Sequence, residues 1–257
     1  MKRPKVAFFD FTGCEGCQVE IANFGQTLLT LLEVVEVAEF REIMKETSSE
    51  PLDIAFVEGS FSRKKDLPKL EKIRQRAALV IAYGSCAATG GINALKNRKP
   101  ASQYKAEVYG GDATMPHLET QPARPISAAI PVDLAIPGCP VNRDEFIHVV
   151  SDLWHGKAPS LPNYPVCMEC KLREHICRYE VGDICLGPVA RAGCGAFCPG
   201  NNIPCEACRG FVGTPNLKSL VEILKNTGMR PDDALKKARM FTANLIDRDF
   251  EHNHFEE

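Results

Sequence analysis

The sequence predicts an α/β chain in which a doubly wound parallel sheet is followed by a loop-rich, cysteine-organised region with C-terminal helices. Short apolar segments alternate with helix-like segments through the first 155 residues, and parallel strands require such crossover connections. Cysteine is unevenly distributed, because eight of the 12 lie between Cys167 and Cys208. We therefore expect a sheet domain over residues 1–160 and a cysteine-rich domain over residues 161–257.

Five segments rich in β-branched and aromatic residues have the length of strands. They are Lys5–Phe11, Val35–Phe40, Asp53–Glu58, Ala78–Tyr83 and Asp133–Ile136. Their apolar runs are nearly continuous, as in a sheet that is buried on both faces. This pattern predicts a flavodoxin-like doubly wound sheet.

Four segments have the spacing of amphipathic helices. Gln18–Leu32 and Lys64–Arg76 lie between predicted strands, and Asn216–Asn226 and Pro231–Ile246 follow the last cysteine. The remaining stretch, Asp247–Glu257, is expected to be a frayed acidic end.

Charge and apolar patterning exclude several classes of protein. The chain has 31 basic and 33 acidic residues, a net charge of -2, which does not favour binding to nucleic acid. Met1–Lys5 leads directly into a strand-length apolar segment, without the core of a signal peptide. No apolar run approaches the roughly 18 residues of a membrane span. In a cytoplasmic chain, 12 thiols are expected to hold metal rather than to form disulfides.

Four cysteines follow predicted strands. Cys14 and Cys17 come directly after the first strand, Cys86 after the fourth and Cys139 after the fifth. The carboxyl ends of parallel strands form the edge at which open α/β sheets bind ligands, and adjacent glycines let the backbone approach a bulky inorganic group. One C-x-x-C pair alone would equally suit a redox disulfide, and a single Cys86 or Cys139 could be a buried core residue. The four together favour a four-thiolate cage.

The cysteine-rich stretch contains two further sets of four. Their spacings are Cys167-x2-Cys170-x6-Cys177-x7-Cys185 and Cys194-x3-Cys198-x6-Cys205-x2-Cys208. Glycine and proline are frequent and large apolar residues few, so little regular helix or strand is expected, and metal–thiolate bonds would supply the folding energy. Two zinc sites fit the spacing, whereas Cys198-Pro199 and the glycines favour iron-sulfur clusters.

Five cysteine motifs occur in a fixed order along the chain. They are Cys14-x2-Cys17, Gly84-Ser85-Cys86-Ala87-x2-Gly90-Gly91-Ile92, Pro137-Gly138-Cys139-Pro140, Cys185-Leu186-Gly187-Pro188 and Cys205-x2-Cys208-Arg209-Gly210. In order, spacing and flanking glycines, over residues 5–213, they resemble the small, electron-transferring subunit of nickel-iron hydrogenases. With its run Asn163–Cys170, the chain is most similar to the delta subunit of cytoplasmic NAD(P)-linked, sulfhydrogenase-type enzymes.

The resemblance implies three 4Fe-4S clusters. It assigns Cys14, Cys17, Cys86 and Cys139 to a proximal cluster, Cys194, Cys198, Cys205 and Cys208 to a medial one, and Cys167, Cys170, Cys177 and Cys185 to a distal one. The exported branch of this family has a histidine and a proline where Cys167 and Cys198 stand here, and it carries a twin-arginine leader. These differences imply four-iron clusters throughout and a cytoplasmic enzyme. Cys198 is the ligand that the spacing supports least.

The resemblance also implies partner chains. A hydrogenase large subunit would carry the nickel-iron site, so no residue of this chain is expected to be catalytic. Electrons from hydrogen oxidation would pass reversibly through the three clusters toward flavin- and NAD(P)-binding or ferredoxin-like subunits. His175 is not needed as a distal ligand, because four thiols already close that site. Two alternatives stay open: a cluster-bearing subunit of a quinone-reductase-type respiratory complex, and a zinc-stabilised binding module.

Overall fold

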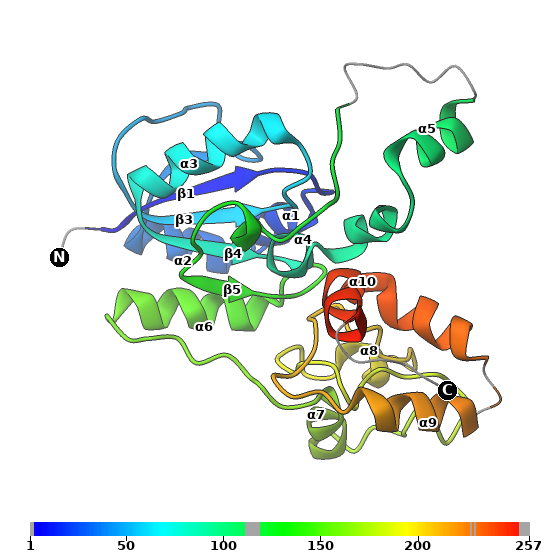
Figure 1. Cartoon of the computed structure of the whole chain (residues 1–257). Helices are drawn as coiled ribbons and strands as arrows, with labels where there is room; N and C mark the ends of the chain where they lie inside the picture. The colour runs from blue at the N-terminus through cyan, green and yellow to red at the C-terminus, as the bar shows by residue number, and fades with distance from the viewer. Residues whose placement is uncertain (1–2, 111–118, 227, 229, 252–257) are drawn as a thin grey trace.

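A five-stranded parallel sheet lies at the centre of the N-terminal part of the chain (Figure 1). The computed structural model describes residues 3–110, 119–226, 228 and 230–251. The strands are β1 (Lys5–Asp10), β2 (Glu36–Phe40), β3 (Leu52–Glu58), β4 (Ala77–Tyr83) and β5 (Leu134–Ile136). Their order, β2-β1-β3-β4-β5, is that of flavodoxin-like folds. The predicted fold class is confirmed, and each strand begins and ends within one residue of its predicted bounds.

Helices cover both faces of the sheet. One face carries α1 (Gly16–Ala22), α2 (Gln26–Val34) and α6 (Arg143–Trp154); the other carries α3 (Leu67–Arg76), preceded by η1 (Lys64–Asp66), and η3 (Ile126–Ala128). Successive strand residues point to opposite faces, so Phe8 packs under the first layer and Phe9 under the second.

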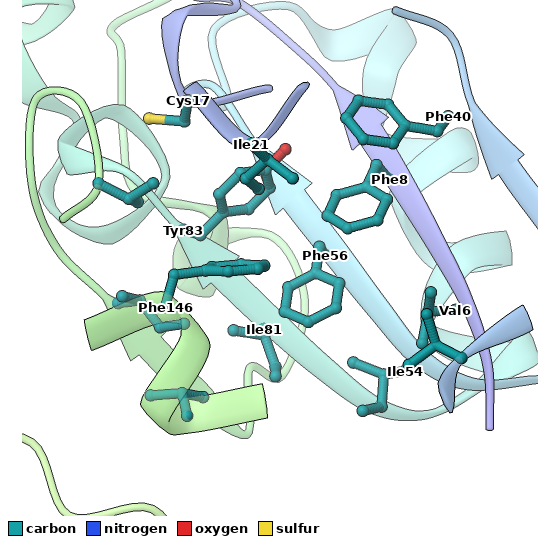
Figure 2. Close-up of a cluster of buried hydrophobic side chains, with 14 of the residues drawn as sticks. Val6, Phe8, Cys17, Ile21, Phe40, Ile54, Phe56, Ile81, Tyr83 and Phe146 are labelled. Atoms are coloured by element: carbon teal, nitrogen blue, oxygen red, sulfur yellow. The ribbon is translucent and has the colours of Figure 1, made fainter. Parts of the chain in front are cut away.

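An aromatic cluster fills the first of these layers (Figure 2). The ring of Phe8 stacks on Phe40 and Phe56, with centroid distances of 4.3 and 4.9 Å. Burial of each such ring contributes about 1.5–3 kcal/mol. Figure 2 shows Cys17 beside Ile21 at the margin of this cluster. The packed core therefore ends where the first predicted ligands begin.

The predicted helix over Gln18–Leu32 is wrong in one respect, because the chain breaks it into α1 and α2. Gly25, which precedes α2, has a φ of +58°, a conformation that interrupts a right-handed helix. Phe24 is 1% exposed and packs against Phe146 of α6. The break thus allows the Phe24 side chain to point into the core.

The segment between β4 and β5 contains helical elements that the sequence analysis does not predict. They are α4 (Ser85–Thr89), the 3-10 segment η2 (Gly91–Arg98) and α5 (Ala101–Tyr109). The first follows β4 directly and carries Cys86. None of the residues of α5 is buried, and Figure 1 shows this helix projecting from the sheet.

The C-terminal part packs around its own apolar cluster. It contains α7 (Val166–Leu172), α8 (Phe197–Gly200), α9 (Leu217–Asn226) and α10 (Pro231–Glu251). The sequence predicts little regular helix or strand near the cysteines. The short helices α7 and α8 are exceptions to this prediction. Leu186, Val189 and Phe211 from the cysteine-rich stretch are buried with Leu220 of α9 and Ile246 of α10. The two C-terminal helices therefore complete a core that the cysteine-rich stretch alone would lack.

The last helix, α10, also contacts the N-terminal part of the chain. Asn244 of α10 donates hydrogen bonds to the carbonyl oxygens of Thr89 and Ala123, both at 3.0 Å. The helix begins at Pro231 as predicted, is kinked at Thr242 and continues to Glu251, into the segment where the sequence predicts a frayed end. Residues 252–257 lie outside the described part of the chain. No helix among the described residues is long and apolar enough to cross a membrane.

Candidate functional site

The first predicted set of thiols lies at the carboxyl edge of the sheet. Cys14 and Cys17 follow β1, Cys86 lies in the first turn of α4, and Cys139 follows β5. Burial raises the pKa of Cys17 and Cys139, and it raises that of Cys86 to about 12. In each case the charge of another thiol of this set adds to the rise. The structure thus brings these four side chains within range of one another.

Glycines bring the backbone close to these sulfur atoms. Gly84 has a φ of +85°, and a Cβ at this position would lie 2.5 Å from Cys17 Sγ. A Cβ at Gly91 would lie 2.9 Å from the amide nitrogen of Cys86 and 3.1 Å from its Sγ. Because side chains are excluded there, the main chain can enclose an inorganic cluster closely. The residues present therefore fit such a group.

Glu58 supports this edge, although the sequence analysis does not single it out. The side chain is 4% exposed, and its carboxylate accepts hydrogen bonds from the amides of Cys17 and Gln18, each at 3.0 Å. Burial raises its pKa, while these hydrogen bonds oppose the rise. The sequence feature that could identify Glu58 is a carboxylate at the end of an otherwise apolar strand. Glu58 fixes the start of α1 and so positions Cys17.

The set from Cys167 to Cys185 gathers around α7. Cys167 and Cys170 lie on this helix, and a Cβ at Gly187 would lie 3.2 Å from Cys167 Sγ and 3.4 Å from Cys185 Sγ. Burial raises the pKa of Cys167 and Cys170 to about 11, and the charges of Cys185 and Cys177 add to the rise. The thiol of Cys177 is exposed. This set therefore reaches the protein surface.

The set from Cys194 to Cys208 includes the weakest predicted ligand, Cys198. Burial and then the charge of Cys194 raise the pKa of Cys198. Burial also raises the pKa of Cys205, and it raises that of Cys208 to about 12. The charge of Cys194 contributes in both cases. Cys198 is therefore close to Cys194 and Cys208 of its predicted set.

This third set also contacts both of the others. The Cys208 thiol lies beside the backbone amide of Cys139, from the first set. On the other side, the amide of Cys205 donates a hydrogen bond to Cys185 Sγ at 3.2 Å, and the charge of Cys194 acts on Cys170. The twelve thiols are thus arranged in a row, with the Cys194–Cys208 set in the middle.

Glu169 joins two neighbouring sets. It lies on α7, and its carboxylate accepts hydrogen bonds from the amides of Gly193 and Ala196 at 2.8 and 2.9 Å. These amides flank Cys194, whose Sγ lies 4.0 Å from Glu169 Oε2. The carboxylate therefore fixes the loop of one set against the helix of the next.

The remaining predicted candidate, His175, is half-buried and lies against the backbone of Gly200, where a Cβ would be 2.7 Å from its Nε2. Among the described residues, no group of three or more His, Cys, Asp or Glu side chains is arranged to hold a single metal ion, in contrast to a larger cluster of several irons.

The chain is similar to a protein family and to curated proteins. The family described as NADH ubiquinone oxidoreductase, 20 kDa subunit, matches residues 14–153. The chain is 38% identical to sulfhydrogenase 2 subunit delta of Pyrococcus furiosus, covering 92% of this chain and 98% of that protein. It is 32% identical to a subunit of the F420-non-reducing hydrogenase vhu of Methanocaldococcus jannaschii, covering 80% and 81%.

The fold of the chain also matches that of a solved structure. The fold matches a chain of an NAD+-reducing [NiFe]-hydrogenase in its H2-reduced state with a TM-score of 0.57 and 26% identity. The match covers 63% of this chain and 96% of that one.

Proposed function

Because the chain belongs to the family of the NADH ubiquinone oxidoreductase 20 kDa subunit and, within it, to the small subunits of nickel-iron hydrogenases, we propose that it conducts electrons through three 4Fe-4S clusters. It is a subunit of an oxidoreductase that acts on hydrogen, and it carries no catalytic residue of its own. The observation that carries the proposal is the row of twelve thiols, in which the middle set contacts both others. The proximal, medial and distal sets are those named in the sequence analysis.

When bound, each cluster accepts and releases one electron, and its potential depends on nearby charge and on hydrogen bonds to sulfur. The chain supplies both. The amide of Cys205 donates to Cys185 Sγ at 3.2 Å, and Asn93 Nδ2 lies 3.6 Å from Cys86 Sγ. Gly84 and Gly187 keep the backbone against the sulfur atoms and leave no space for competing side chains. The protein therefore holds the clusters in line and tunes the energy of an electron on each.

The two ends of the row would face different partners. Cys14 and Cys139 are exposed at the proximal end and Cys177 at the distal end. We propose that the proximal end faces the large subunit with its nickel-iron site. The distal end would face a flavin- and NAD(P)-binding or ferredoxin-like subunit, with electrons passing in either direction. We also propose a cytoplasmic location, because cysteine stands at positions 167 and 198, where the exported branch has histidine and proline.

A second candidate is a cluster-bearing subunit of a quinone-reductase-type respiratory complex. It is favoured by the family match over residues 14–153. The eight cysteines from Cys167 to Cys208 lie beyond that match, whereas the similarity to the sulfhydrogenase subunit covers 92% of the chain. The hydrogenase function therefore explains more of the sequence.

Iron and sulfide analysis of anaerobically purified protein tests the number of clusters. Three 4Fe-4S clusters predict about twelve iron atoms and about twelve sulfides per chain, with paramagnetic signals in the reduced state. Cys139→Ser and Cys198→Ser should each abolish one signal, and they should abolish different ones. A colourless zinc protein would contradict the proposal, and an unchanged spectrum of Cys198→Ser would remove Cys198 from the medial set.

Activity of the assembled complex separates the two oxidoreductase candidates. Hydrogen-dependent dye reduction is expected for the wild type and should be lost with Cys17→Ala. Quinone reduction that needs no hydrogen would favour the respiratory alternative.

A further inference from the structure

Arg209 makes three hydrogen bonds from a fully enclosed position. It is 3% exposed, and its Nε donates to the carbonyl oxygen of Ala192 at 2.8 Å. Nη1 donates to the carbonyl oxygen of Pro137 at 2.7 Å, and Nη2 to Glu145 Oε1 at 2.5 Å. The Glu145 side chain is 6% exposed. The guanidinium thus links three segments, around Arg209, Pro137 and Ala192, and it also binds Glu145 of α6.

Each of these segments borders a predicted ligand. Pro137 lies two residues before Cys139 of the proximal set, Ala192 lies two residues before Cys194 of the medial set, and Arg209 directly follows Cys208. The hydroxyl of Ser85 also donates to the carbonyl oxygen of Cys208. The side chain of Arg209 therefore lies at the joint between two neighbouring sets.

The backbone of Gly193 lies directly against the guanidinium of Arg209. Gly193 has a φ of +113°, and a Cβ there would lie 2.5 Å from Arg209 Nη2. A guanidinium in such a site has its position fixed by its acceptors, because its planar fork is rigid. Movement of one thiol set relative to the other would break at least one of the three hydrogen bonds.

The joint also carries two buried or half-buried guanidinium groups. Arg191 is half-buried beside Arg209, and its Nε is buried without a hydrogen-bond partner among the described residues. Burial lowers the pKa of Arg191, and the charge of Arg209 lowers it further. Glu145 opposes these two cations, and the charge of Glu169 also acts on Glu145. Buried charge requires compensation, and a cluster bound by four thiolates is an anion.

We propose that Arg209, held by Glu145, is a positioning residue that fixes the proximal cluster relative to the medial one and raises the reduction potential of the medial cluster. The inference rests on the proposed electron-transfer function. The fixed hydrogen bonds set the spacing of the two clusters, and the positive charge stabilises an added electron on the nearer one.

Two substitutions at the ion pair test the charge effect with opposite signs. Arg209→Gln removes a positive charge and should lower the medial midpoint potential. Glu145→Gln removes a negative charge at nearly constant shape and should raise it. The medial midpoint potential of each variant is measured by redox titration of the complete complex, monitored by paramagnetic resonance. The midpoint potential of the distal cluster is the internal reference, because it is expected to move less.

A third substitution isolates the positioning effect. Arg209→Lys keeps the charge, but its ammonium group cannot make the same three hydrogen bonds as the planar guanidinium. The medial potential should stay near that of the wild type, while the magnetic interaction between the reduced proximal and medial clusters changes and the complex melts at a lower temperature.

Arg74 provides the matched control. It pairs with Asp133 and donates to the carbonyl oxygens of Ala77 and Ala78, at the opposite end of β4 from Cys86. Arg74→Gln should lower stability without moving any potential. The inference is overturned if Glu145→Gln retains its clusters and leaves the medial potential unchanged, or if both charge substitutions move it in the same direction. If the wild type holds no clusters, the proposed function itself fails.

Discussion

Two kinds of residue determine the candidate site: thiols that would bind iron and buried groups that hold the thiols. The thiols are recognisable from the sequence, since spacing and flanking glycines identify them. The supporting carboxylates Glu58 and Glu145 are not, because their partners Cys17 and Arg209 lie 41 and 64 residues away. Spacing along a chain contains no information about such contacts.

Gly84 gives a prediction at the scale of one residue. In Gly84→Ala the new methyl group would lie 2.5 Å from Cys17 Sγ, so the proximal cluster should be lost, a fall of about four iron atoms per chain. The other two clusters should retain their signals. Iron analysis and paramagnetic resonance of purified protein measure both.

Gly110→Ala is the control, because Gly110 has a φ of +86° and a ψ of 174°, close to the +85° and 156° of Gly84, and no atom lies within 4 Å of the position that a methyl group would take. It carries comparable backbone strain, about 1–3 kcal/mol, without the clash. Equal iron loss in both variants would show that strain, not contact with sulfur, is the cause.

At the scale of elements, α10 joins the two parts of the chain. Its Asn244 contacts the carbonyl oxygens of Thr89 and Ala123 and accepts a hydrogen bond from Asn97 at 3.0 Å. Asn244→Ala should therefore lower the free energy of unfolding by about 2 kcal/mol, from lost hydrogen bonds and unpaired carbonyl groups. Denaturant unfolding measures this value.

Asn216→Ala serves for comparison, since the Asn216 side chain accepts a hydrogen bond from the nearby amide of Ser219 at 3.0 Å. Loss of this helix cap should lower the free energy of unfolding by about 1 kcal/mol. The paramagnetic signal of the proximal cluster should stay unchanged. If Asn244→Ala is no more destabilising than Asn216→Ala, α10 does not hold the two parts together.

The strands were predictable and the helix breaks were not, for physical reasons. β1 and β3 are continuous apolar runs between polar segments, which identifies buried strands directly. The break between α1 and α2 depends on the packing of Phe24 against Phe146, two residues that are far apart in the sequence. The apolar spacing of the segment alone continues through the break.

For the whole molecule, we propose that residues 1–160 and 161–257 form two parts, of which the second does not fold without the first. Separate apolar clusters support the division. Arg209 and Asn244 bind across it. The part from residue 161 onward also depends on metal binding, because cluster formation would supply folding energy there.

Removal of iron should therefore affect the two parts differently. After anaerobic chelation, limited proteolysis should first cut the cysteine-rich stretch near exposed residues such as Leu172 and Ile176. Mass spectrometry should recover the sheet part intact at early times. Iron-loaded protein under the same conditions is the reference, and first cleavage within β1 to β4 would contradict the division.

The position of α10 against α4 also bears on how the protein is made in the cell. The strands and Cys86 are synthesised early, but the residues that cover α4, including Asn244, leave the ribosome much later. Until then, helix α4, which carries Cys86, lacks its final neighbour. The first thiol set therefore reaches its final surroundings only after nearly the whole chain has been synthesised.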